Sequence, residues 1–410
     1  MTSREASGQR SETVRRANLS TILQELHLHG PLSRSELVSR TGLTRSAIRG
    51  LIGELASGGL VTEERSASIG APGRPSPLSR PRADRHVVLA LEIAIDSLAV
   101  ALVGLGGEVL ELQRVDRARG HLDADRLVDD LARLARPLLE RQAQRAAVVG
   151  IGLSMVGVVR ASDGMIRVAP NLGWRDVPLA DVVARKLRLD VPVTVANDGD
   201  LGALAEHRRG AAIGVDDVIY VAGEVGVGGG VIVAGRRLEG AGGYAGEIGH
   251  IRVNPSGSEC RCGARGCWET EVGERALLRR AGQRPTGGRA AVDGVFRAAA
   301  GGSPVALDAL TATGEWLGTG LASIVNVFNP SLIVLGSLFG RMHPYVSAQV
   351  EQALSSGAMD APGEMVRVVP AALGEDAPLL GAAELAFEPL LIDPAGWLAP
   401  RPALVRVAGA

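Results

Sequence analysis

The chain has 410 residues, more than one ordinary domain holds, so two or three separate cores are expected. No apolar stretch reaches the roughly 20 residues that cross a bilayer, and the charged N-terminus carries no secretory signal. A cytoplasmic protein without a membrane partner is therefore predicted. The three cysteines all fall within residues 260–267, which excludes a disulfide framework and leaves a metal site or a local redox site.

The net charge of −1 conceals an asymmetry between the two ends of the chain. Residues 1–86 contain 13 Arg and 8 Asp or Glu, a balance of +5, which leaves −6 for the remainder. A basic segment is the natural candidate for binding nucleic acid. Because aromatic residues make up only 3% of the chain, little material is present for stacking unpaired bases, and duplex DNA is the favoured partner.

The N-terminal segment predicts a helical domain over residues 14–80, preceded by a disordered arm at residues 1–13. Within residues 14–28, leucine and isoleucine recur every three or four positions, the spacing of an amphipathic helix. Gly30 and Pro31 follow this stretch, and the two residues end the helix.

Two shorter helices, joined by a turn, are expected next. Ser33 and Glu36 form a capping-box signature at the start of the second helix, which ends near Gly42. Thr44 caps the third helix, whose inward face carries the apolar side chains Ile48, Leu51, Ile52 and Leu55. A helix, a turn and a second helix in this order are typical of DNA-binding domains, although the apolar stripe also suits the core of any three-helix domain.

The outward face of the third helix carries side chains suited to contacting DNA. Arg45, Ser46 and Arg49 share that face and can reach base edges and phosphates in the major groove. Arg34 is expected to contact the DNA as well. A short strand and a Gly- and Pro-rich turn with Arg74 at its tip then predict the wing of a winged helix-turn-helix.

Residues 81–388 have the pattern of an α/β domain. Apolar runs, the first over residues 87–103, predict buried strands, and a helix is expected over residues 123–142. A second set of strands follows, with a long helix around residues 303–328 before its last members, so two similar halves are predicted. Residues 389–410 match no pattern and form an unassigned tail.

A dense group of metal-binding residue types lies in the second half of the chain. Three cysteines and one histidine fall within eighteen residues and suffice for a tetrahedral zinc shell: His250, Cys260, Cys262 and Cys267. A redox site would show a lone C-x-x-C beside a thioredoxin-like pattern, which the sequence lacks. One structural zinc per chain is predicted. Because the protein supplies all four ligands, the metal organises a loop and activates no water.

Three segments resemble the ROK family, whose name joins repressors, open reading frames and kinases. The most specific is GEIGH at residues 246–250, followed by C-x-C-G-x-x-G-C-x-E at residues 260–269. Residues 169–179 resemble the family's sugar-proximal loop, and residues 195–206 resemble its catalytic Asn-Asp segment. The resemblance extends to about residue 388 and implies two actin-like lobes with a sugar cleft between them, preceded in the repressor branch by a winged helix-turn-helix.

The resemblance also implies a sugar pocket formed by six residues, which are Asn171, Asn197, Asp198, Glu247, His250 and Glu269. A buried sugar needs convergent polar partners, because each unpaired polar group costs about 1–3 kcal/mol, and these side chains supply them. Taken singly, the two asparagines and Asp198 are also ordinary turn residues. No Arg or Lys is among the six, so a neutral, unphosphorylated sugar is the expected effector.

Two segments that resemble the family's nucleotide loops depart from the kinase pattern. Residues 92–97 lack the glycines of a D-x-G-G-T loop and include Asp96, and Glu224 replaces a glycine in the second segment. Carboxylates repel phosphates, so loss of ATP binding and of enzyme activity is expected, with Asp198 as a vestigial base. The favoured function is a DNA-binding repressor controlled by a sugar, acting as a homodimer or a dimer of dimers. The alternatives are a sugar kinase with a DNA-binding appendage and a protein-binding scaffold.

Overall fold

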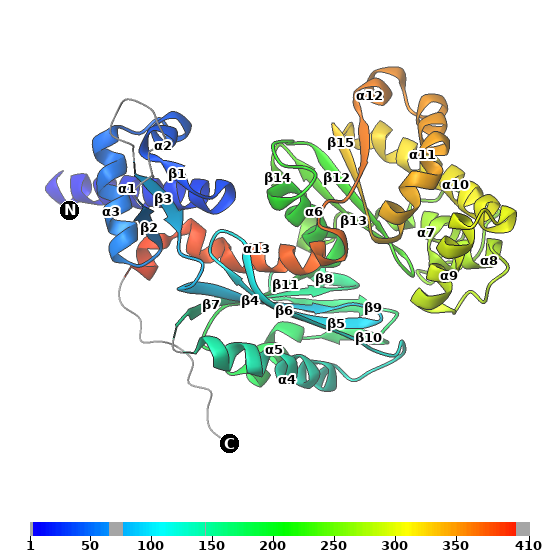
Figure 1. Cartoon of the computed structure of the whole chain (residues 1–410), viewed down its shortest axis with the longest axis horizontal. Helices are drawn as coiled ribbons and strands as arrows, with labels where there is room; N and C mark the ends of the chain where they lie inside the picture. Colours follow the sequence, from blue (N-terminus) through cyan, green and yellow to red (C-terminus); the bar gives the residue numbers. More distant parts are fainter. Residues whose placement is uncertain (1–2, 65–76, 144, 399–410) are drawn as a thin grey trace.

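The computed structural model describes residues 3–64, 77–143 and 145–398 (Figure 1). An N-terminal domain is followed by two α/β lobes, and α13 (Ala377–Ile392) runs from the lobes back to the N-terminal domain. In this part of the chain, no helix is both long enough and apolar enough to cross a membrane.

The N-terminal domain contains three helices, α1 (Ser3–His29), α2 (Arg34–Thr41) and α3 (Arg45–Ser57). Its small sheet has the order β1-β3-β2, with β1 at Leu32–Ser33, β2 at Val61–Glu64 and β3 at Leu78–Pro81. The predicted wing, with Arg74, falls at residues 65–76, outside the described residues. Residues 3–13, where a disordered arm was expected, continue α1 as helix.

Both helix caps expected from the sequence are present in this domain. The Ser33 hydroxyl accepts a hydrogen bond from the backbone N–H of Glu36. In return, the Glu36 carboxylate accepts one from the backbone N–H of Ser33 at 2.7 Å. The Thr44 hydroxyl accepts from the backbone N–H of Ala47 at 3.3 Å at the start of α3. Gly42 turns the chain between α2 and α3 with a φ of 71°, a left-handed conformation that glycine adopts without strain.

The first lobe is built on a five-stranded sheet in the order β11-β7-β4-β5-β6. Three strands form an antiparallel meander, β4 (His86–Ile93), β5 (Ser97–Gly104) and β6 (Glu108–Asp116). β7 (Ala147–Met155) and β11 (Val193–Asn197) add in parallel beside β4. A small sheet of β8 (Val158–Arg160), β9 (Met165–Ala169) and β10 (Trp174–Val177) extends from β7. The helices α4 (Ala124–Gln142) and α5 (Leu179–Leu187) cover one face of the main sheet, and α13 covers the other.

The second lobe repeats this topology in the order β14-β13-β12-β15-β16. Its meander consists of β12 (Val218–Gly223), β13 (Val227–Val233) and β14 (Arg236–Arg237). β15 (Leu332–Gly336) and β16 (Arg367–Pro370) add in parallel beside β12. Written from its other edge, the sheet of the first lobe has the order β6-β5-β4-β7-β11, so each strand has a counterpart in the second lobe with the same direction. The prediction of two similar halves is therefore confirmed.

Helices surround the sheet of the second lobe, and four short 3-10 helices occur in the connections. The α-helices are α7 (Trp268–Val272), α8 (Glu274–Arg280), α9 (Gly288–Ala300), α10 (Pro304–Phe328), α11 (Ser337–Gly357) and α12 (Asp360–Met365). The 3-10 helices are η1 (Ala241–Gly243), η2 (Ile248–His250), η3 (Gly374–Asp376) and η4 (Pro394–Trp397). The bounds of α4 and α10 agree with the helices expected at residues 123–142 and 303–328.

Two helices join the lobes to each other and to the N-terminal domain. α6 (Asp198–Arg209) packs closely on α13, where a Cβ at Gly381 would lie only 2.0 Å from the carbonyl oxygen of Leu201. The C-terminal half of α13 shares a buried core with α1 and α3, and η4 packs on α1. Beyond the boundary expected at residue 388, the chain continues as structured helix, and its residues to 398 contact the N-terminal domain.

Candidate functional site

A cavity of about 630 Å³ lies between the two lobes. Its walls come from the β7–β8 turn and the β9–β10 loop on one side, and from β13, η2 and the cysteine-bearing loop on the other. All six residues assigned to the sugar pocket line this cavity: Asn171, Asn197, Asp198, Glu247, His250 and Glu269. The fold thus brings together groups that are nearly 100 residues apart in the sequence.

Asn197 fixes the start of α6 at the cavity wall. Its Oδ1 accepts from the backbone N–H groups of Gly199 at 2.8 Å and Asp200 at 3.4 Å, and its Nδ2 donates to the carbonyl oxygen of Gly157 at 2.9 Å. The Asn197 side chain also hydrogen-bonds the Asp198 carboxyl. The same cap aims Asp198 into the cavity, where burial raises the pKa of its carboxyl to about 6 and the charge of Glu247 adds to the shift.

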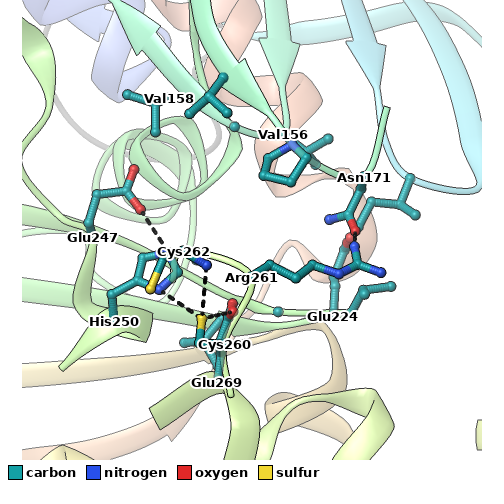
Figure 2. A pocket seen from close by; sticks show the side chains of 18 of the residues that line it. Val156, Val158, Asn171, Glu224, Glu247, His250, Cys260, Arg261, Cys262 and Glu269 are labelled. Atoms are coloured by element: carbon teal, nitrogen blue, oxygen red, sulfur yellow. Dashed lines mark hydrogen bonds and ion pairs between the residues drawn. The ribbon is translucent and has the colours of Figure 1, made fainter. Parts of the chain in front are cut away.

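Glu247 precedes η2, His250 is its last residue, and the two side chains face each other (Figure 2). The His250 Nε2 is 3.8 Å from a Glu247 carboxylate oxygen, and its Nδ1 is 3.6 Å from the Sγ of Cys260. Cys260 also donates to the Glu269 carboxylate at 3.0 Å. One short turn therefore presents a carboxylate to the cavity and an imidazole nitrogen to the cysteine cluster, as the i, i+3 spacing of Glu247 and His250 predicts.

His250, Cys260, Cys262 and Cys267 form a compact donor set. Their ligand atoms all lie within 4.8 Å of one another. The sulfur atoms of Cys262 and Cys267 are 3.7 Å apart. Two sulfurs bound to one tetrahedral zinc at about 2.3 Å would be separated by about 3.8 Å. The cluster can therefore hold a metal ion. Two isolated β-bridges, Arg252 with Cys267 and Glu259 with Arg265, shape the loop that carries the cysteines.

Four arginines, which the sequence patterns do not single out, line the same cavity: Arg175, Arg261, Arg275 and Arg279. The Nη1 of Arg261 donates to the Oδ1 of Asn171 across the cavity (Figure 2). No Arg or Lys is among the six assigned positions, but the cavity as a whole includes these four arginines. For Arg261 the sequence does contain a signal. The residue lies between Cys260 and Cys262, and a metal bound by these cysteines would also fix the position of the side chain between them.

An adjoining cavity of about 330 Å³ contains both segments that depart from the nucleotide-loop pattern. Asp96 pairs with Arg119 at 2.9 Å, and Arg119 also pairs with Glu274 of α8 at 2.6 Å, which ties the first lobe to the second. Glu92 pairs with Arg114 at 2.8 Å, yet burial raises the pKa of its carboxyl to about 7. Two acids of this region, Glu92 and Asp96, are therefore paired with arginines.

Glu224 lies at the junction and lines both cavities. Burial raises the pKa of its carboxyl to about 8, and the charges of Asp198 and Glu92 add to the shift. Its carboxyl group is therefore mostly protonated at neutral pH. The repulsion of phosphates expected from a charged Glu224 is therefore weakened at neutral pH.

The predicted DNA face lies on the N-terminal domain, away from both cavities. Arg45, Ser46 and Arg49 are exposed on α3. Arg34 differs, because its Nη2 donates to both carboxylate oxygens of Glu63 on β2 at 2.7 and 2.9 Å. The arginines of α3 are the better placed of the predicted DNA contacts.

The chain has a helical N-terminal domain, and behind it a duplicated α/β domain. A polar cavity lies between the two lobes of matching topology. These features define a two-lobed sugar-kinase-like protein with an added domain. Residues 88–388 match the model of the ROK family, and the chain belongs to that family. The N-terminal domain lies outside this match.

Two relatives that match nearly the whole chain are regulators. The xylose repressor of Bacillus subtilis (strain 168) is 28% identical over 380 residues, which cover 92% of this chain and 97% of the repressor. A crystal structure of a ROK family transcriptional regulator, described as a homolog of the Escherichia coli Mlc protein, has a TM-score of 0.75 and 26% identity, covering 94% of this chain and 97% of that one. A ROK family glucokinase from Streptomyces griseus, solved with glucose and AMPPNP, is 33% identical with a TM-score of 0.63, and covers 73% of this chain and 99% of its own.

Proposed function

We propose that this chain is a sugar-responsive transcriptional repressor, with α3 of a winged helix-turn-helix contacting operator DNA and the interlobe cavity binding a sugar effector. The observation that carries the proposal is the presence in one chain of an exposed arginine-bearing helix and a polar cavity, joined through α13. Repressors among the relatives match nearly the whole chain, whereas the glucokinase covers only 73% of it. Regulation of carbohydrate uptake or catabolism genes follows as the biological role.

The proposed metal is one structural zinc per chain, held by His250, Cys260, Cys262 and Cys267. The zinc would stabilise the loop that carries Arg261 and would hold Glu269 against the cavity. The donor set supports this role, because three thiolates and one imidazole leave no open position on a tetrahedral ion.

In this proposal, the protein does not phosphorylate the sugar that it binds. Nucleotide phosphates need backbone N–H groups that only glycine lets them approach, and residues 92–97 supply none of the kinase glycines. To bind here, the phosphates of a nucleotide would also have to break the ion pairs of Arg119 with Asp96 and Glu274. These features support a sensor in which Asp198 accepts a hydrogen bond from a sugar hydroxyl.

The second candidate is a sugar kinase with a DNA-binding appendage, which the retained Asp198 favours. Its test is sugar-dependent ADP formation by the purified chain, compared with an Asp198→Asn variant. The repressor proposal expects no ADP above background from either protein. ADP formation that the variant lacks would establish the kinase.

The proposed function is tested first by selecting duplexes from a random DNA pool with the purified chain. A repressor that acts as a dimer should enrich one sequence with two half-sites spaced by one helical turn or a multiple of it. Enrichment of no sequence over several rounds would contradict it and would favour a protein-binding scaffold.

A further inference from the structure

The four arginines on the interlobe cavity have no part in the sugar contacts assigned above. Arg175 comes from β10 in the first lobe, and Arg261 comes from the cysteine-bearing loop of the second. Arg275 and Arg279 lie one turn apart on α8. All four line the cavity and remain open to solvent, so their guanidinium groups can reach a ligand without a conformational change in the core.

These arginines lack the carboxylate partners that neighbouring arginines have. Arg265 in the same loop pairs with Glu259 at 2.8 Å, and Arg280 next to Arg279 pairs with Glu271 at 3.4 Å. Among the ion pairs of the described residues, by contrast, none involves an arginine of the cavity. The single hydrogen bond from Arg261 to Asn171 uses one of its five N–H groups.

The arginines and most of the acids of the cavity come from different elements, and Glu269 lies near both groups, since its charge raises the pKa of Arg275 and of Glu247. Burial, followed by the charge of Arg261, lowers the pKa of the Arg275 guanidinium, so the two cations lie close enough to destabilise each other. Asp198 is affected instead by the nearby charge of Glu247. The cavity therefore has a basic end at α8 and the cysteine-bearing loop, where the arginines outnumber Glu269, and an acidic end at the start of α6.

We propose that the effector is an acidic sugar, one that carries a phosphate or a carboxylate, and that Arg261 and Arg275 bind its anionic group. This inference rests on the proposed function, because it specifies the ligand of the same cavity. Hydroxyl groups bind at the acidic end, where carboxylates accept hydrogen bonds. The oxyanion binds at the basic end, where planar guanidinium groups donate paired hydrogen bonds and where its charge relieves the repulsion between two cations. An acidic sugar replaces the neutral sugar expected from the six assigned positions.

Calorimetric titration of the purified full-length chain at constant ionic strength tests the inference. The ligands are matched series of glucose, galactose and mannose, each as free sugar, 6-phosphate and uronic acid, together with xylose, xylose 5-phosphate and inorganic phosphate. In at least one series, an acidic member should bind about tenfold or more tightly than its neutral parent, the contribution of one hydrogen bond to a charged group. The phosphate and uronate members distinguish the two sources of the anion.

Replacement of Arg275 by Gln should remove that preference and leave affinity for the neutral parent unchanged. Arg261→Gln, in the cysteine-bearing loop, provides a second variant if Arg275→Gln lowers the melting temperature. The matched control is Arg284→Gln, which removes an exposed arginine outside the cavity and should leave all affinities unchanged.

Three results would overturn the inference. The first is that no acidic sugar binds more tightly than its parent in any series, and the second is that Arg275→Gln weakens parent and acidic sugar equally. The third is that inorganic phosphate alone binds as tightly as the sugar phosphate. A neutral sugar that binds and changes operator affinity would leave the proposed function intact while the acidic effector is rejected.

Discussion

Glu224 illustrates how burial changes the chemistry of one side chain. Its carboxyl has a pKa of about 8 in the folded chain, well above the 4.5 of an exposed glutamate, because burial disfavours the charged form. Between these two values the folded state holds a proton that the unfolded state has released. The contribution of Glu224 to stability therefore falls as pH rises from about 4.5 to about 8.

Glu224→Gln removes this pH-dependent cost, because the amide cannot ionise. We expect the free energy of unfolding of the variant, relative to the native chain, to increase from pH 6 to pH 8 in urea titrations. Glu351→Gln, at an exposed position on α11, is the control and should show no such trend. An equal difference at every pH would mean that Glu224 is ionised throughout.

Replacement of Cys262 tests the proposed zinc site by removing a single ligand. The residue is exposed, so Cys262→Ser leaves no buried void, yet it removes one thiolate from the donor set. We expect elemental analysis to give about one zinc per native chain and much less than one in the variant, since tight structural sites need all four ligands. Ser256→Ala, exposed in the same loop, should keep its zinc. A native chain prepared without chelator that contains no zinc would refute the assignment.

At the scale of elements, α3 is expected to enter the major groove. Each of Arg45→Gln and Arg49→Gln should weaken operator binding by about 1–3 kcal/mol if the arginine contacts a base edge. If an arginine contacts a phosphate instead, its loss should weaken all duplexes alike and reduce the salt dependence. Arg126→Gln, exposed on α4, is the control. Unchanged operator affinity in the double variant would remove α3 from the interface.

A buried network fastens α1 of the N-terminal domain to α13 and α6. The His27 Nε2 lies 3.0 Å from the Glu384 carboxylate, which also accepts from the Nε of Arg209 at 2.8 Å. The His27 Nδ1 accepts from the backbone N–H of Gly106 at 3.0 Å, so the proton resides on Nε2 and the imidazole is neutral. Burial lowers the pKa of His27 in agreement with this tautomer.

The network makes the stability of the chain depend on pH. An unfolded histidine takes up a proton near pH 6.5, whereas the folded His27 takes it up only at lower pH, so stability should fall as pH drops below about 6.5. His27→Gln should reduce the loss of unfolding free energy between pH 7 and pH 5. His29→Gln, two residues along the same helix and exposed, should retain the full loss. Identical pH profiles for the native chain and His27→Gln would show that another group titrates.

For the molecule as a whole, local patterns predict well and long-range packing does not. Capping residues such as Ser33 and Thr44 act on their own helices, so the sequence predicts the starts of α2 and α3. Residues 3–13 have no apolar stripe, and nothing local distinguishes the extension of α1 from a disordered arm. The docking of α13 on α1, the burial of Glu224 and the arginines of the cavity all depend on contacts between distant segments, which no spacing rule encodes.

The coupling between cavity and operator belongs to the whole molecule. α6 begins at Asp198 on the cavity and ends at Arg209, which pairs with Glu384 of α13, and Glu384 contacts α1 of the N-terminal domain. A sugar can change DNA affinity only through different affinities for two arrangements of these parts. Coupling of about 1–3 kcal/mol corresponds to a change of about 5- to 150-fold in operator affinity.

Operator affinity measured by fluorescence anisotropy, with and without a saturating sugar, tests the central claim most directly. The chain should release the operator, with its dissociation constant raised about 5- to 150-fold by the sugar. A Glu247→Gln variant should bind the operator normally and lose the response. A sugar that stabilises the chain against heat and yet leaves the operator dissociation constant unchanged would contradict a sugar-controlled repressor.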